Sequence, residues 1–305
     1  TFNPNNLDET WDELVDSPEK PFFNRVLQAQ YQPGGLAQLV MIAFARVNNI
    51  SLATEFDQAD ESIDIANTTL NCLMPPPSST LSLEQAFLYG CPAPIQEIAT
   101  TLGLDRTEQY MRDFFPSEAI TLESWTEQVN ETDQTSSNIF LTSPTPQSDE
   151  SPELSNALGQ GQINATPLTI AGITAAIINN GNSPKPHILS AIQQPESDIW
   201  ESIPQFAPTI PIMTSETATQ LRTLMRSNVN SGHASMASQT GFNIGGLGAL
   251  AYSGERTLSW FTGFVTDENG QGYVITILLE DVASLDIPVS IGGQLLASTM
   301  SHIEN

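Results

Sequence analysis

The chain has 305 residues, enough to bury a large core in one two-lobed domain or in two smaller ones. Hydrophobic residues make up 39%, as in a globular protein, but charged residues make up only 14%, and Ser, Thr, Asn and Gln supply the remaining polarity. Nine Lys and Arg against 35 Asp and Glu give a formal net charge of −26, which excludes nucleic acid and anionic lipid surfaces as electrostatic partners.

The first part of the chain predicts an extended region followed by a buried helix. Residues 1–34 are rich in Pro, Asn and acidic side chains, which predicts a loop with one short helix around residues 11–15. In residues 36–47, after the turn "YQPGG", apolar side chains recur at helical spacing. Their longest apolar run, "LVMIAFA", is far shorter than the ~18 to 20 residues of a membrane span. We expect a core helix here and no membrane span within the chain.

The middle of the chain predicts helices followed by a long loop. Residues 79–104 begin with a capping pair, Ser82 and Gln85, and predict two helical pieces separated at Pro92 and Pro94. Residues 126–157 are dense in Ser, Thr, Pro, Gln and Asp without periodicity, which predicts an irregular loop.

The two cysteines, Cys72 and Cys91, lie 19 positions apart in this region. Neither a Cys-x-x-Cys pair nor a histidine cluster accompanies them, so we expect no zinc site. They either form a disulfide, which would indicate an extracytoplasmic location, or stay separate as buried thiols.

The last part of the chain predicts two helices, a sheet and a final helix. Residues 166–181 read as a helix that Thr166 caps, with Pro167 at its first position, and residues 215–232 repeat this design from Ser215 and Glu216. Three strand-like runs follow at 244–252, 257–266 and 273–281, separated by short turns, which indicates an antiparallel sheet. A helix at 288–303 is expected to cover one face of that sheet.

Several stretches resemble the transpeptidase domain of the penicillin-binding proteins, the serine acyltransferases that cross-link peptidoglycan. They include "NRVLQAQYQPGG" at 24–35, "SWFTGFV" at 259–265 and, most specifically, "GQGQINATPLTIAGITAAIINNG" at 159–181. The resemblance implies a two-lobed α/β (α+β) fold like that of the transpeptidases and β-lactamases. We expect a single domain, residues 1–305, whose α/β lobe comprises residues 1–35 and 160–305 around an antiparallel sheet, and whose helical lobe comprises residues 36–159.

Enzymes of this family carry three motifs: Ser-x-x-Lys at a helix start, Ser-x-Asn at a helix junction and Lys-Thr-Gly on a strand. The serine attacks an acyl donor and the lysine removes its proton. Placed on this chain, all three motifs are replaced: the first falls on Gly35 and Gln38, the second on Gly90, Cys91 and Pro92, and the third on Gly246, Leu247 and Gly248.

The resemblance therefore implies a transpeptidase fold without a catalytic residue, a cofactor or a metal. The main hypothesis is an inactive binding or scaffolding module that contacts cell-wall peptide or other cell-wall assembly proteins. Such a module would be extracytoplasmic and tethered to the membrane by an upstream segment. Two alternatives remain open: an active D,D-transpeptidase or serine hydrolase that binds penicillin through non-standard residues, and a reversible sensor of wall peptides or β-lactams.

Other candidate residues favour structural roles. Ser17 and Lys20 fit Ser-x-x-Lys, but no apolar helix follows them. Residues 239–241, "QTG", are a second possible place for the third motif. Cys91 has no neighbouring His or Lys that would lower its pKa, so a disulfide or core thiol is favoured over a nucleophile. Single side chains with an expected structural role are the surface histidines His187, His233 and His302 and the core aromatics Trp260 and Phe261.

Overall fold

The computed structural model describes residues 3–18, 20–65, 68–116, 152–188, 191–193, 199–202, 209–253, 256–267 and 270–303. Its centre is an antiparallel sheet of β9 (Ile244–Ser253), β10 (Arg256–Thr266) and β11 (Gly272–Glu280), in the order β11-β10-β9. In the register of this sheet, Trp260 of the central strand pairs with Ala249 on one side and Leu278 on the other. All three strands agree with the predicted runs.

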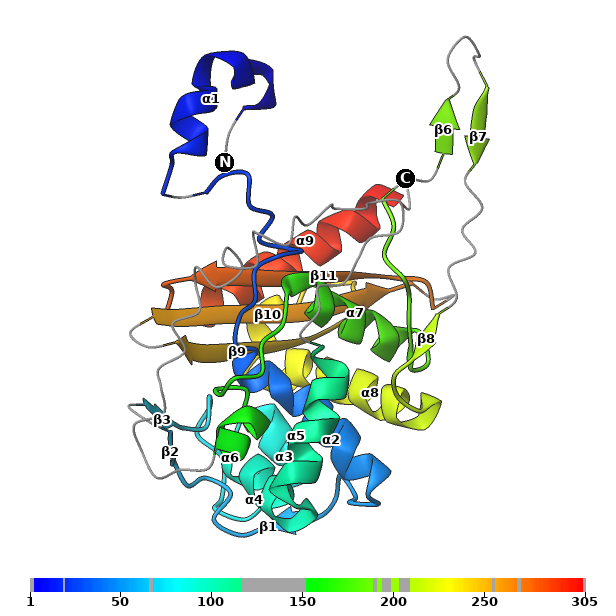
Figure 1. Cartoon of the computed structure of the whole chain (residues 1–305). Helices are drawn as coiled ribbons and strands as arrows, with labels where there is room; N and C mark the ends of the chain where they lie inside the picture. The colour runs from blue at the N-terminus through cyan, green and yellow to red at the C-terminus, as the bar shows by residue number, and fades with distance from the viewer. Residues whose placement is uncertain are drawn as a thin grey trace.

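Helices cover both faces of the sheet. Helix α9 (Asp286–Ile303) packs on β10 and β11 from one side, and α7 (Pro167–Ile178) and α8 (Ser215–Ser231) pack from the other (Figure 1). Because side chains alternate along a strand, Trp260 joins the core beneath α7 and α8, whereas Phe261 joins the core beneath α9. Both aromatic side chains are fully buried, as expected for core residues.

A group of helices that includes α2 (Ala37–Val47) lies beyond β9 (Figure 1). The chain enters α2 through the 3₁₀ turn η2 (Gly34–Leu36), and nine consecutive residues of the helix, from Ala37 to Ala45, are buried. The other helices of the group are α3 (Leu83–Tyr89), α4 (Ala93–Leu102), α5 (Leu104–Phe114) and α6 (Pro152–Ala157), of which α4 and α5 pack directly on α2. This packing makes α2 the core helix that its apolar sequence predicts.

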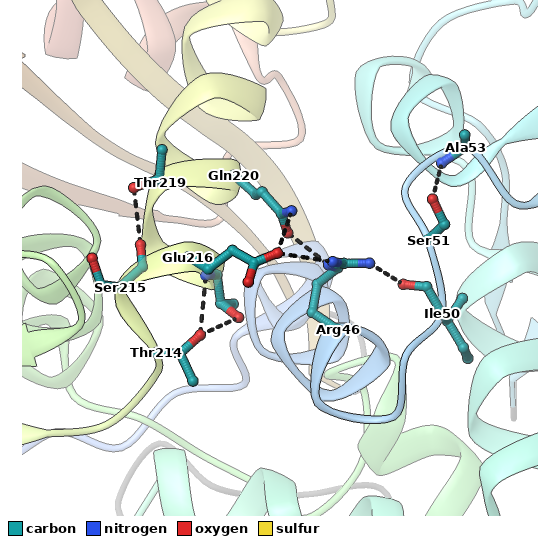
Figure 2. A network of polar contacts seen from close by, with 10 residues as sticks. Arg46, Ile50, Ser51, Ala53, Thr214, Ser215, Glu216, Thr219 and Gln220 are labelled. Atoms are coloured by element: carbon teal, nitrogen blue, oxygen red, sulfur yellow. Dashed lines mark hydrogen bonds and ion pairs between the residues drawn. The ribbon is translucent and has the colours of Figure 1, made fainter.

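Arg46, at the end of α2, connects the helical group to α8 (Figure 2). Its guanidinium donates to Gln220 Oε1 at 2.6 Å and to the Ile50 carbonyl at 2.9 Å, and it lies 3.4 Å from a carboxylate oxygen of Glu216. Glu216 belongs to the first turn of α8, which Thr214 caps by accepting the Thr217 N–H. One arginine thus joins three segments of the chain.

Shorter elements complete the described fold. They are η1 (Pro4–Asn6), α1 (Leu7–Val15), β1 (Glu55–Phe56), β2 (Ile63–Ile65), β3 (Thr68–Leu70), β4 (Leu81–Ser82), β5 (Asn182–Ser183), β6 (Ala191–Gln193), β7 (Trp200–Ser202), β8 (Ile210–Pro211) and η4 (Ser235–Ala237). The strands among them form the pairs β1-β4, β2-β3, β5-β8 and β6-β7.

Some sequence expectations need correction. Helix α5 was not predicted, because most of its side chains are polar and only one face is buried. Residues 152–157, at the end of the predicted loop, form α6, while residues 126–151 lie outside the described residues. Helix α8 begins at Ser215 as predicted, and Thr214 caps it. The capping box of Ser82 and Gln85 is present as predicted.

Candidate functional site

The turn before α2 lies directly against the edge of the sheet. Gly34 has φ +55°, and a Cβ atom placed on it would lie 2.1 Å from the Leu250 carbonyl oxygen. Its N–H donates to the Gly159 carbonyl at 2.9 Å. Gln32, two residues earlier, is also fixed in place, because the Trp260 indole N–H donates to its backbone carbonyl at 2.9 Å. The backbone of this turn packs so closely against β9 that only glycine fits at position 34.

Gly35, predicted at the nucleophile position, faces β9 from the start of α2. A Cβ atom at this position would meet only Ala249 within 4 Å, with its Cβ 3.3 Å away. A small side chain would therefore fit here with a slight adjustment of its neighbour. Because it is a glycine, Gly35 offers only backbone atoms at this position.

Gln38, predicted at the base position, lies one helical turn further on. It is only 8% exposed, and no donor among the described residues reaches its Oε1 atom. Buried polar atoms are normally paired, so this amide oxygen is an exception among the described side chains.

A cavity of about 60 Å³ brings most of the predicted positions together. Gly35, Gln38, Gly90 and Pro92 all line it. Its lining among the described residues contains no Ser, Thr, Cys, Lys, Arg or His. Tyr252 supplies the one hydroxyl, and burial raises the pKa of that phenol, which therefore stays protonated at neutral pH.

The third predicted motif position lies beside the cavity rather than in its wall. Gly246, Leu247 and Gly248 do not line it, and β9 reaches the cavity at Leu250 and Tyr252 instead. The Gly246 carbonyl accepts a hydrogen bond from Asn228 Nδ2 at 3.0 Å, and the Gly248 carbonyl lies 3.0 Å from His233 Nε2. These strand carbonyls thus face α8 and the segment that follows it.

His233 is half-buried and both its ring nitrogens lie near backbone carbonyls, which corrects the expectation of a surface histidine. Its second ring nitrogen, Nδ1, lies 3.0 Å from the Leu88 carbonyl, so the imidazole bridges α3 and β9. Burial lowers the pKa of His233, and the neutral ring can donate to only one of the two carbonyls. It serves as a polar link between α3 and β9, and it does not line the cavity.

Cys72 and Cys91 form a disulfide beside the second predicted motif position. The bond removes Cys91 as a thiol nucleophile. Next to it, Gly90 has φ +64°, and a Cβ atom there would lie 2.7 Å from Leu73 Cδ1. Position 90 therefore accepts no side chain without displacement of Leu73.

The other sequence candidates lie away from the cavity, whose lining includes neither Ser17, Lys20 nor residues 239–241. His187 and His302 do not line it either. Within the described residues, no group of three or more His, Cys, Asp and Glu side chains is arranged to hold a metal ion.

Gln160 is the functional candidate that the sequence reasoning missed. It lines the cavity, its Nε2 lies 3.3 Å from the Leu250 carbonyl, and its Oε1 accepts the Tyr252 N–H at 2.9 Å. The sequence marks Gln160 only by its place in "GQGQ", within the stretch that most specifically resembles the family. No local pattern predicts its contact with Leu250, which lies 90 residues further along the chain.

A family model described as the penicillin binding protein transpeptidase domain matches residues 1–299. The chain belongs to this family. Curated relatives of this transpeptidase domain include peptidoglycan D,D-transpeptidase PbpA of Mycolicibacterium smegmatis, 26% identical over 195 residues, which are 62% of this chain and 37% of that protein. Peptidoglycan D,D-transpeptidase MrdA of Haemophilus influenzae is 23% identical over 195 residues, which are 61% of this chain and 28% of the relative. The matches thus cover well under half of the relatives' length.

Solved structures share the fold. Penicillin-binding protein A from M. tuberculosis, as an imipenem acyl-enzyme complex, matches 98% of this chain and 67% of its own with a TM-score of 0.71 and 20% identity. The D,D-transpeptidase domain of a peptidoglycan glycosyltransferase from Eggerthella lenta matches 98% and 73% with a TM-score of 0.75 and 18% identity. The expected mixed α/β transpeptidase fold is confirmed. Within the described residues, no helix is both long and apolar enough to span a bilayer.

Proposed function

We propose that this transpeptidase domain binds the peptide part of peptidoglycan without forming an acyl-enzyme, and acts as a binding or scaffolding module in cell-wall assembly. The observation that carries the proposal is Gly35, which stands at the start of α2 facing β9 where the family's serine is expected. Acyl transfer through an enzyme intermediate needs a nucleophile and a base that activates it. The described lining of the cavity offers neither, since its one hydroxyl is a protonated phenol.

An active D,D-transpeptidase is the second candidate, and the comparisons favour it. The named relatives are D,D-transpeptidases, and one of the solved neighbours is an acyl-enzyme. This function would need a nucleophile outside the described lining of the cavity. Ser17 is such a residue by its Ser-x-x-Lys spacing, but it does not line the cavity.

The proposed location is extracytoplasmic, with a membrane tether outside this chain. The disulfide between Cys72 and Cys91 supports an oxidising compartment, where such bonds persist. The net charge of −26 disfavours anionic lipid surfaces as partners.

The proposal is tested by measuring binding and turnover together. The domain is sedimented with purified peptidoglycan, and D-alanine release from the same material is followed, with an active transpeptidase domain of the family as the control. We expect sedimentation of the domain that excess soluble wall peptide reverses, and no D-alanine above the protein-free rate. Release of D-alanine would overturn the proposal in favour of the active enzyme, and loss of sedimentation would overturn the binding role.

A further inference from the structure

Two arginines of α8 lie next to one another without an acidic partner. Arg222 and Arg226 are one helical turn apart, so their side chains leave the same face of the helix. Neither forms an ion pair with a carboxylate of the described residues, although the chain has 35 Asp and Glu and only nine Lys and Arg. Four other arginines each form such a pair, namely Arg25, Arg46, Arg112 and Arg256. The two positive charges on α8 therefore repel each other without compensation from the described part of the chain.

The guanidinium of Arg226 has a fixed position against the end of β10. Its Nη2 donates to Thr266 Oγ1 at 2.8 Å, and its Cζ lies 5.6 Å from the centre of the Phe264 ring. Burial lowers the pKa of Arg226, and the charge of Arg222 lowers it further, but an arginine stays protonated at neutral pH. A partly desolvated positive charge thus faces a second positive charge, and an anion placed between them would relieve both penalties.

This pair of arginines lies far from the cavity. The cavity meets β9 at Leu250 and Tyr252, and the residue between them pairs with Leu258 of β10. Thr266 lies at the other end of β10, about 26 Å from Leu258 at 3.3 Å per residue. A group bound in the cavity therefore does not reach Arg226, and the pair is a separate site.

The chemistry of the pair suits an oxyanion. A guanidinium binds a carboxylate or a phosphate through two parallel N–H donors, and two guanidinium groups can share one such group. The net charge of the chain, −26, disfavours a polyanion, so a single anionic group is the better match. We propose that Arg222 and Arg226 bind one oxyanion, a carboxylate or a phosphate. The inference goes beyond the proposed function, because it concerns a site outside the cleft.

An NMR titration tests this site with two probes, inorganic phosphate and acetate, each compared with sodium chloride at equal ionic strength. The wild type is compared with Arg222→Gln, Arg226→Gln and the matched control Arg112→Gln, which removes the same charge from an arginine that Glu108 already pairs. We expect the backbone N–H signal of Thr266 to shift saturably in the wild type and in the control.

Each Gln variant of the arginine pair should lose about tenfold or more in affinity, because hydrogen bonds between charged groups are among the strongest in proteins. Saturable binding of phosphate or of acetate shows which oxyanion the site takes, and either result supports the inference. Absence of a saturable shift with both probes, or equal affinities in the wild type and the variants of the pair, would overturn it.

Urea unfolding separates a binding role from a purely structural one. Replacement of chloride by phosphate should raise the midpoint of the wild type and of Arg112→Gln but not that of Arg226→Gln, because a ligand stabilises only a state that binds it. A lower midpoint of Arg226→Gln in chloride, together with no effect of phosphate on the wild type, would show a structural arginine and overturn the inference. Neither measurement involves the cleft or D-alanine release, so this inference and the proposed function can fail separately.

Discussion

A methyl group added at each of two neighbouring glycines should have very different effects. Gly34→Ala places a Cβ 2.1 Å from the Leu250 carbonyl oxygen at φ +55°, whereas Gly35→Ala meets only the Ala249 Cβ at 3.3 Å. A left-handed conformation costs a residue other than glycine about 1–2 kcal/mol, and overpacking adds about 1–3 kcal/mol. We expect Gly34→Ala to lose about 2–5 kcal/mol of unfolding free energy and Gly35→Ala less than about 1 kcal/mol.

Urea unfolding under non-reducing conditions measures these differences, with a common slope for all variants. Gly241→Ala is the matched control, because Gly241 has φ +88° with no atom within 4 Å of an added Cβ and therefore reports backbone strain alone. If Gly34→Ala were no more destabilising than Gly241→Ala, the turn before α2 would not lie against β9, and the geometry of the cleft would be refuted.

Three further predictions concern links around the cleft. Because burial lowers the pKa of His233 below that of the unfolded chain, its contribution to stability is complete above about pH 6.5 and is lost as the pH falls through the folded pKa; urea midpoints at pH 7.5 and 5.5 should therefore differ more in the wild type than in His233→Gln. Replacement of Cys72 and Cys91 by alanine should cost about 3 kcal/mol by the chain-entropy model, and an unchanged urea midpoint would contradict a disulfide in solution. Arg46→Met should cost about 1–3 kcal/mol, whereas Glu216→Gln, whose side chain is 75% exposed, should cost less than about 0.5 kcal/mol; equal costs would contradict the contacts of Figure 2.

Local patterns predicted the elements whose signals are contained within a few residues. The cap of Thr166, the proline after it and the left-handed Gly181 define α7 in the sequence as in the structure. The three strands were found because each is apolar along its length and ends at a turn. Helix α5 escaped because its buried face amounts to a few side chains among charged neighbours, and a polar sequence gives a weak helical signal.

The sequence predicts which residues follow the turn before α2, but it does not predict which residues of β9 face the cavity, because that depends on the register of the strand. Gly35 and Gln38 follow a turn whose sequence is distinctive, and both line the cavity. On β9, a displacement of one or two residues changes which groups face the cleft, and the cavity meets Leu250 and Tyr252 instead of residues 246–248. The contacts of Gln160 and His233 join segments far apart in the chain, which no local pattern encodes.

The most direct test of the central claim is the intact mass of the domain after incubation with excess benzylpenicillin, beside an active transpeptidase domain of the family as the positive control. We predict that the control gains the mass of one penicillin and that this domain gains none. A stoichiometric adduct on this domain would contradict the account, and peptide mapping of the adduct would then begin at Ser17, the Ser-x-x-Lys serine outside the cavity.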